Sequence, residues 1–338
     1  MAANPPTVTV CVPTIGRAAT LEATLESVRR QTFADYELIL LDNAAPEGVA
    51  ARLDEYARSD SRAKVLRSPT RIPMFENFQR GIDAASGRYL AYFHDDDIYA
   101  DDFLARHVDL LEANPHVAFA GGNCTIIDAE GQFMSDRALI RRTEVWSGWR
   151  YITEVFSIGN NIFPMQSIMF RRAALGPQTF DSGRGAHFTD YFILMRLAEN
   201  ADVGLIDARL LQLRTHDGQA SRSLTANVEL RLRTRLFEEY ADGLLARRPE
   251  RAEEIRKLRR QVSSARRSAA VWMWLQATDR RRASDARWAL EGSALDVFIR
   301  GFLGLLDRSG LARLVRSKGS RRYIRSVAFS IVGRGRGR

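Results

Sequence analysis

The sequence of 338 residues contains only two cysteines, Cys11 and Cys124, which lie far apart in the chain. So few thiols argue against a disulfide framework and against a structural zinc site, and they fit a reducing compartment. No apolar run reaches about 18 residues, so we expect no transmembrane helix. Residues 1–6 form neither a basic stretch nor an apolar one, so we expect no signal peptide and a cytoplasmic protein.

Charge is distributed unevenly along the chain. Hydrophobic residues make up 45% and charged residues 27%, which is typical of a globular protein. Residues 241–338 carry 24 Arg and Lys against 9 Asp and Glu, which leaves a net charge of −6 on residues 1–240 of a chain whose total is +9. A segment this basic seeks anionic surfaces such as phospholipid, nucleic acid or an acidic partner.

Within the basic region, residues 295–306 and 323–332 mix apolar stripes with arginine. This composition favours amphipathic helices that lie on an anionic membrane surface. The alternative is that these helices pack on the rest of the chain, or on another subunit, with their arginines solvated.

Predicted strands alternate with predicted helices over the first hundred residues. We expect strands at 7–12, 36–41, 63–67 and 88–93, and helices at 17–32, 49–59 and 75–85. This alternation implies a parallel sheet with crossover helices, in which ligands bind at the carboxyl ends of the strands. Residues 13–17, 42–43 and 94–97 would therefore meet at one edge.

The pattern is looser after residue 100. We expect helices at 102–114, 150–157 and 188–199, and strands at 117–127 (interrupted at Gly121 and Gly122), 166–171 and 203–206. Beyond residue 226 the sequence predicts an almost wholly helical, arginine-rich region. The expected organisation is an α/β body of residues 1–225 followed by a helical basic extension of residues 226–338.

Three adjacent carboxylates, Asp95, Asp96 and Asp97, directly follow the fourth predicted strand. Because neighbouring carboxylates repel one another, such a cluster at a strand end tends to hold a cation. Proteins usually hold Mg²⁺ or Mn²⁺ with one or two carboxylates together with substrate phosphates. The position of the triplet favours a metal–diphosphate site over a solvated acidic turn.

Several short motifs together resemble the signatures of family 2 inverting glycosyltransferases. They are Val12-Pro13-Thr14 with Arg17, Asp42-Asn43, Asn77, Ser86-Gly87-Arg88-Tyr89 and Asp95-Asp96-Asp97. The resemblance covers about residues 7–220. It implies a GT-A fold with a mixed or parallel sheet flanked by helices, with a donor-binding half at about 1–100 and an acceptor-binding half at about 101–225.

The resemblance assigns donor binding to a set of residues at this edge. They are Pro13, Thr14, Arg17, Asp42, Asn77, Asp95, Asp96 and His216. Asp42 would accept a hydrogen bond from the nucleotide base, and its alternative is a capping or turn aspartate. The donor would be a uridine or thymidine diphosphate sugar, and the acceptor would be a glycan or a lipid-linked saccharide.

The resemblance also implies Mn²⁺ or Mg²⁺ as a cofactor. Asp97 would coordinate the metal directly, with Asp95 and His216 as further ligands. Asp96 could either contact the ribose of the donor or coordinate the metal. His216 follows Arg214 in a region where the family often places a loop that closes over the diphosphate. Its alternative is a surface histidine. The family often has a further aspartate at the position of His94, which leaves the register of the acidic cluster on the metal open.

Inverting transfer is a displacement at the anomeric carbon, so a base must take the proton of the acceptor hydroxyl. Thr189-Asp190-Tyr191, at the start of a predicted helix, resembles the family's Glu-Asp pair, with Thr189 in place of the acidic neighbour. Asp190 falls on the position of the base. A helix N-terminus favours its ionised form, and an aspartate that serves only the helix dipole is the alternative.

The implied function is sugar transfer in the synthesis of a bacterial surface or lipid-linked glycan, at the inner face of the cell membrane. The first alternative is a sugar nucleotidyltransferase, which usually has a glycine-rich loop after its first strand, whereas this chain has only Gly16 there. The second is a non-catalytic protein that binds nucleic acid or membrane through its basic tail. An inactive relative that keeps the fold is the third. The acidic body and the lack of a nucleic-acid motif argue against nucleic acid.

Overall fold

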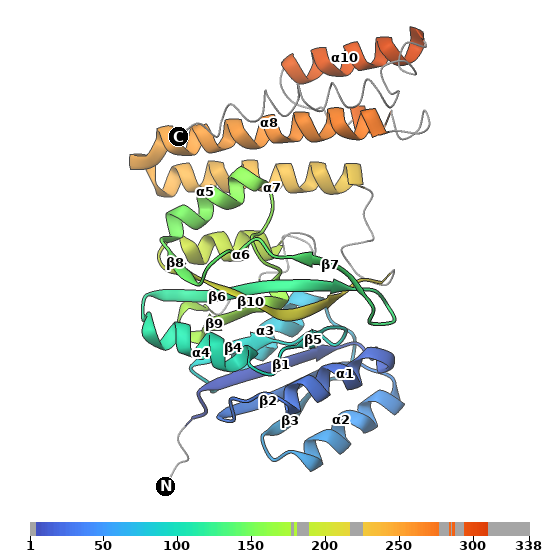
Figure 1. Ribbon diagram of the computed structural model, residues 1–338, viewed down its shortest axis with the longest axis vertical. Helices are drawn as coiled ribbons and strands as arrows, with labels where there is room; N and C mark the ends of the chain where they lie inside the picture. Colours follow the sequence, from blue (N-terminus) through green and yellow to red (C-terminus); the bar gives the residue numbers. More distant parts are fainter. Residues whose placement is uncertain are drawn as a thin grey trace. The chain divides into compact units, whose positions relative to one another are not determined.

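The computed structural model describes residues 5–176, 179–180, 189–216, 226–276, 284, 286–287 and 294–309 (Figure 1). The chain divides into two compact units. One consists of residues 1–155 and 160–220, and the other of residues 156–159 and 221–338.

The first unit begins with four parallel strands in the order β3-β2-β1-β4. The strands are β1 (Val8–Thr14), β2 (Tyr36–Asn43), β3 (Ala63–Ser68) and β4 (Tyr89–Tyr92), and the helices between them are α1 (Ala18–Arg29), α2 (Glu47–Ser59) and α3 (Met74–Ala84). Apolar side chains of β1 and β2 are wholly buried between the helical layers. The predicted parallel arrangement of these strands and crossover helices is confirmed.

The sheet continues past β4 with strands of mixed direction. Its order is β3-β2-β1-β4-β9-β6-β10-β5, with β7 paired to β6 and β8 paired to β10. These elements are β5 (Ile98–Tyr99), β6 (Val117–Ile127), β7 (Phe133–Arg137), β8 (Glu144–Trp146), β9 (Ile168–Arg171) and β10 (Asp202–Arg214), with helices α4 (Phe103–Ala113), α5 (Gly148–Ile158) and α6 (Thr189–Ala198). The predicted α/β class with a mixed sheet flanked by helices is therefore confirmed.

Two strand predictions need correction. Strand β6 runs unbroken through Gly121 and Gly122, because both glycines pair with neighbouring strands: Gly121 with β9 and β10, and Gly122 with β10. The space beside these glycines is filled from other elements. A Cβ atom on Gly121 would lie 2.6 Å from the ring of Phe163, and one on Gly122 would lie 2.9 Å from Cδ1 of Leu210. Strand β10 has 13 residues instead of the predicted four, because register shifts let it keep pairing with β6.

An aromatic cluster supports the turn that carries the acidic triplet. The rings of Phe93 and Tyr99 stack at 3.6 Å between centroids, and Phe103 of α4 contacts both rings edge-on. The backbone N–H of His94 donates a hydrogen bond to the hydroxyl of Tyr99 at 2.8 Å. Buried side chains therefore hold the turn after β4 in place.

The second unit consists of helices, as the sequence predicts for the described part of residues 226–338. Its main helices are α7 (Ala226–Arg247), α8 (Ala252–Gln276) and α10 (Ala294–Ser309), with a 3-10 turn at Pro249–Arg251. An ion pair of 2.7 Å between Arg259 and Asp242 joins α8 to α7. None of the helices among the described residues is long and apolar enough to cross a membrane.

Candidate active site

The carboxyl ends of β1, β2 and β4 form the edge at which the predicted polar residues meet (Figure 1). Thr14 ends β1 and lies opposite Asp42 of β2 in the parallel register. The loop after β1 needs a glycine at position 16. Gly16 has a φ of +100°, and a Cβ atom there would lie 2.4 Å from Cδ of Pro46.

Asp95 connects the acidic triplet to the loop after β1. One carboxylate oxygen accepts a hydrogen bond of 2.6 Å from the hydroxyl of Thr14, and the other accepts one of 3.0 Å from the guanidinium of Arg17. The hydroxyl of Thr20 donates to the backbone carbonyl of Asp95 at 2.7 Å. These bonds hold the triplet against the first strand and its following helix, α1.

Asp96 and Asp97 connect the triplet to the end of β10. The ring Nε2 of His216 lies 3.0 Å from a carboxylate oxygen of Asp96. The backbone N–H of Arg214 donates to one oxygen of Asp97 at 2.8 Å, and the Nε–H of Arg214 donates to the backbone carbonyl of Asp96 at 2.9 Å. His216 therefore lies in direct contact with Asp96, while its predicted role as a metal ligand stays a prediction.

The second carboxylate oxygen of Asp97, Oδ2, is buried and has no hydrogen-bond partner within the described part of the chain. Burial and the adjacent charge of Asp96 raise the pKa of Asp97 well above its usual value. A buried carboxylate in this state is stabilised either by a proton or by a cation.

His94 completes a group of three possible metal ligands. One of its ring nitrogens and carboxylate oxygens of Asp96 and Asp97 all lie within 4.8 Å of one another. The Nε2 atom of His94 is buried, and no described residue bonds to it. Burial lowers the pKa of His94, so its imidazole stays neutral and keeps a lone pair for a ligand. The sequence signalled this residue only as a departure from the family pattern.

A cavity of about 290 Å³ lies beside the triplet. Its wall is formed by Pro13, Thr14, Ile15, Arg17, Asn43, Arg71, Ile72, Met74, Asn77, Phe78, His94 and Asp95. The wall therefore contains five of the residues predicted to bind the donor, at positions 13, 14, 17, 77 and 95. Ligand pockets usually measure about 300–1,000 Å³, so this one suits the nucleoside part of a donor better than a whole nucleotide sugar.

Asp42 is not among the described residues that form the cavity wall. One of its carboxylate oxygens accepts a hydrogen bond from the backbone N–H of Ala45 at 2.9 Å, and the other accepts one from Nε of Arg67 at 2.6 Å. Its neighbour Asn43 reaches the cavity instead and is fixed by two hydrogen bonds to the backbone of Ile72. Base recognition by Asp42 stays a prediction, and any bond to a base would add to these two contacts.

Asp190 lies in the first turn of α6, within a second group of contacts. Nδ2 of Asn161 donates to its carboxylate at 3.1 Å, and the guanidinium of Arg137 donates to the backbone carbonyl of Asn161 at 2.9 Å. The residue keeps some exposed surface, but its carboxyl group is enclosed by protein. This burial raises the pKa of Asp190 to about 6, against the opposing effects of its hydrogen bonds and of Arg137.

The sequence and the fold both match known sugar-transferring enzymes. Residues 9–175 match the family model described as glycosyl transferase family 2. The chain belongs to this family. One similar protein is the UDP-Glc:alpha-D-GlcNAc-diphosphoundecaprenol beta-1,3-glucosyltransferase WfgD of Escherichia coli, with 22% identity over 71% of this chain and 88% of the relative. Another is a PGL/p-HBAD biosynthesis glycosyltransferase of Mycobacterium bovis, with 31% identity over 40% of this chain and 56% of the relative.

Solved structures show the same fold. The glycosyltransferase resembles residues 1–349 of S. aureus TarS in complex with UDP-GlcNAc, with a TM-score of 0.62 and 13% identity, over 84% of this chain and 79% of that one. It also resembles the mannosyltransferase PcManGT of Pyrobaculum calidifontis in complex with GDP-Man and Mn²⁺, with a TM-score of 0.51 and 17% identity, over 98% of this chain and 86% of that one. These similarities establish the GT-A architecture.

The glycosyltransferase thus brings most of its predicted site residues into two groups. The first joins the cavity wall to residues 94–97 and His216, and the second surrounds Asp190. Residues 217–225, which directly follow His216, lie outside the described residues. Arg71, Met74 and Phe78 line the cavity but carry no sequence signal beyond their place in or beside α3.

Proposed function

We propose that this glycosyltransferase transfers a sugar, with inversion of the anomeric configuration, from a nucleotide-diphosphate sugar to a hydroxyl group of a lipid-linked glycan. The observation that carries the proposal is the arrangement at the end of β4, where three carboxylates and His94 adjoin a nucleoside-sized cavity. Uridine diphosphate is the favoured donor nucleotide over thymidine diphosphate, because WfgD is named for UDP-Glc and TarS was solved with UDP-GlcNAc. WfgD is also named for a diphosphoundecaprenol-linked acceptor.

The residues present fit a divalent cation. Asp97 Oδ2 and His94 Nε2 are buried polar atoms that no described group satisfies, and Asp96 offers a third ligand beside them. Carboxylates suit both Mg²⁺ and Mn²⁺, and the imidazole favours Mn²⁺. Bound there, the ion would supply charge neutralisation on the diphosphate leaving group. Arg17, which contacts Asp95, adds positive charge on the same side, and His216 contacts Asp96 there.

Asp190 is the proposed base. With a pKa of about 6, its carboxylate is mostly ionised at pH 7 and is more basic than an ordinary aspartate. Asn161 holds one carboxylate oxygen, which fixes the direction in which the other can accept a proton. Removal of the acceptor proton during attack on the anomeric carbon, with departure of the nucleoside diphosphate, gives the opposite anomeric configuration in the product.

A lipid-linked acceptor lies at a membrane, so we propose that the enzyme acts at the cytoplasmic face of the cell membrane and is held there by its basic C-terminal region. This region concentrates the positive charge of the chain. Anionic lipid surfaces attract such segments.

The test is a panel of UDP- and dTDP-sugars incubated with the protein and a polyprenyl-diphosphate-linked acceptor, with Mn²⁺, with Mg²⁺ or with a chelator. We expect one donor to be consumed and its sugar to appear on the acceptor, with no transfer in chelator. Asp97→Ala should lose transfer, whereas Asp128→Asn, in the turn between β6 and β7, should keep it. Transfer that survives chelation would contradict the metal, and no turnover of any donor would contradict the function.

A further inference from the structure

One side of helix α10 is buried against its own unit. Leu303 is 5% exposed and belongs to a buried cluster with Leu230, Ala270, Trp274, Leu275 and Ala286 of the same unit. Ile299 and Leu306, on the same side of the helix, pack partly against this cluster. Within the part of the chain that the structure describes, the apolar contacts of α10 with its own unit therefore come from one side of the helix.

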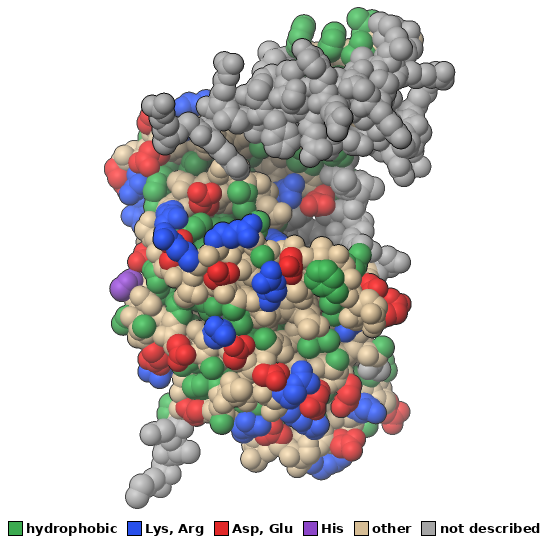
Figure 2. Space-filling model, viewed as in Figure 1, with side chains coloured by type: hydrophobic (Ala, Val, Ile, Leu, Met, Phe, Trp, Pro, Cys, Tyr) green, Lys and Arg blue, Asp and Glu red, His purple; other side chains and the backbone are tan. Residues whose placement is uncertain are grey.

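The other side of α10 is also apolar, and it is exposed. Its residues Val297, Phe298, Phe302 and Leu305 are exposed by 53%, 71%, 52% and 63%. Phe298, Phe302 and Leu305 follow the i, i+4, i+7 spacing of one helical stripe, and Val297 flanks it. Figure 2 shows hydrophobic side chains standing over this helix, at the top of the view. We call these four residues the outer face of α10.

Four large apolar side chains exposed together on one helix are more than an ordinary protein surface carries. Isolated exposed apolar residues are normal, whereas a contiguous patch indicates a binding surface. Gly301 and Gly304 extend the patch, because a Cβ atom on either would meet nothing within 4 Å. The backbone of α10 is thus open to close approach beside the two phenylalanines.

Positive charge lies along the same helix. A hollow of about 890 Å³ is lined by Arg287, Arg300 and Arg308, with Asp307 as its acidic residue. Asp307 is already engaged, since it forms an ion pair with Arg287 and accepts a hydrogen bond from Nε1 of Trp274 at 3.0 Å. Among the described residues that line this hollow, three are arginines and one is an aspartate.

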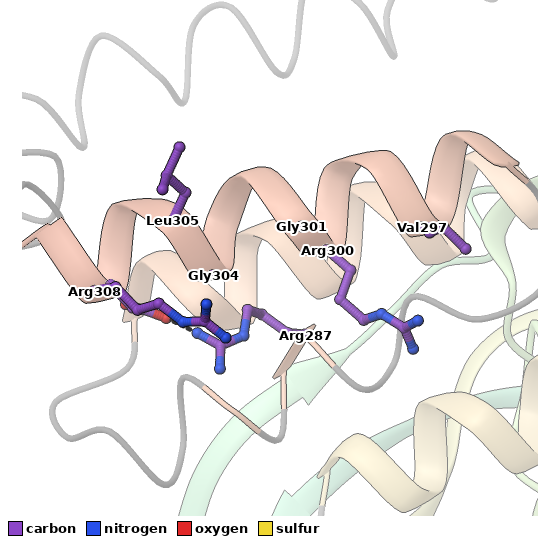
Figure 3. Close-up of a pocket in the computed structure, with 8 residues that line it drawn as sticks. Arg287, Val297, Arg300, Gly301, Gly304, Leu305 and Arg308 are labelled. Atoms are coloured by element: carbon purple, nitrogen blue, oxygen red, sulfur yellow. Dashed lines mark hydrogen bonds and ion pairs between the residues drawn. The ribbon is translucent and has the colours of Figure 1, made fainter.

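Apolar and cationic groups lie close together on α10, since Val297 and Leu305 line the same hollow as the arginines. Figure 3 shows Leu305 pointing to one side of the helix and Arg300 and Arg308 pointing to the other, with Arg287 on a neighbouring segment. A helix with an apolar side and an arginine side is typical of helices that lie in a membrane interface. The long stems of arginine let the guanidinium groups reach phosphates while the apolar side chains enter the lipid.

We propose that the outer face of α10 docks on an anionic phospholipid bilayer, with its apolar residues among the acyl chains and its arginines at the lipid phosphates. Charge favours this occupant over a second copy of the chain, because a symmetric contact through α10 would bring Arg300 and Arg308 of two copies together. The inference specifies how the proposed membrane localisation is achieved. It can be tested without donor or acceptor, so its failure would leave the proposed sugar transfer standing.

The test is flotation of the full-length protein with vesicles of phosphatidylcholine alone or of phosphatidylcholine mixed with phosphatidylglycerol. We expect binding to the anionic vesicles only, weakened by high salt. The double variant Phe298→Ser/Phe302→Ser should lower the partition coefficient at least about tenfold. The matched control is Phe133→Ser, which alters a phenylalanine exposed by 66% on β7 of the other unit and should leave binding unchanged.

A labelling experiment reports insertion directly and does not depend on loss of function. Both native cysteines are buried, so a cysteine introduced at an exposed site can be labelled selectively with an environment-sensitive fluorophore. The label on Phe298→Cys should shift to the blue with anionic vesicles, whereas the label on Phe133→Cys should not.

Three results would overturn the proposal. The first is equal binding to both kinds of vesicle, which would remove the role of charge. The second is unchanged binding by the double serine variant together with an unshifted label at position 298, which would place the lipid contact elsewhere. The third is a dimer in solution that the double variant dissociates, with no vesicle binding, which would make a second copy the occupant.

Discussion

Replacing the proposed base by its neutral isostere should stabilise the protein while abolishing its activity. Asp190 has a pKa of about 6 in the folded protein, compared with 3.8 for an unperturbed aspartate. Because the folded-state value is the higher one, the folded protein binds a proton between these pH values that the unfolded chain has already lost. Stability therefore falls as pH rises from about 4 to about 6 and stays at the lower level above that range.

The size of the effect follows from the two pKa values. A difference of about two pKa units corresponds to about 3 kcal/mol between the ionised and protonated forms of the folded protein. Asp190→Asn removes this cost, so it should raise the free energy of unfolding of the first unit by up to about 3 kcal/mol at neutral pH. The gain should be about half as large near pH 5, because Asp190 is mostly protonated in the folded wild type there and its buried charge destabilises the protein less.

Urea unfolding of both proteins at these two pH values, followed by intrinsic fluorescence, measures the difference. Sugar transfer by Asp190→Asn should fall by about 10²–10⁴-fold, and wild-type turnover should decline as pH drops through about 6. Asp136→Asn is the control, since Arg209 lowers the pKa of this exposed carboxyl group and the residue lies outside the site. A variant that is less stable than wild type at neutral pH, or a gain that does not change with pH, would refute the reasoning.

Three further predictions follow from single contacts. Gly121→Ala should lower the free energy of unfolding by about 1–3 kcal/mol, because its Cβ would meet the ring of Phe163 at 2.6 Å; unchanged urea unfolding would contradict this packing. Arg67→Met should destabilise the first unit by about 1–3 kcal/mol, because it leaves the buried carboxylate of Asp42 with one hydrogen bond. The control Arg52→Met removes an exposed ion pair with Glu22 and should be nearly neutral in the same urea assay. His94→Ala should weaken Mn²⁺ binding, measured by calorimetry with UDP present, about tenfold or more, and equal affinity would remove this residue from the metal site.

The fold of the first hundred residues could be predicted from sequence because most of its elements have a clear pattern. Strands β1, β2 and β4 are short apolar runs with buried side chains, β3 is a partly buried edge strand, and the helices between the strands carry one apolar stripe each. The part of the fold after β4 was harder to predict. Strand β7 is almost wholly exposed and has no buried alternation, so nothing in its sequence separates it from a loop. The predicted break in β6 was wrong because the side chain that fills the space beside Gly121 comes from Phe163, far along the chain.

In the candidate site, too, the sequence predicts local features but not contacts between residues that are far apart in the chain. The position of the acidic triplet at a strand end is a local feature, and the sequence predicts it. The partner of each carboxylate is not local: Asp95 bonds to the loop after β1, while Asp96 and Asp97 bond to residues at the end of β10. The ion pair of Asp42 with Arg67 likewise depends on the pairing of β2 with β3.

Inversion with Asp190 as the base is tested most directly by NMR analysis of the transfer product, made by the wild type and by Asp190→Asn from the donor that the panel identifies. We expect a glycosidic bond of anomeric configuration opposite to that of the donor, formed by the wild type and nearly absent with the variant. A product that retains the donor configuration, or transfer by Asp190→Asn at the wild-type rate, would contradict it.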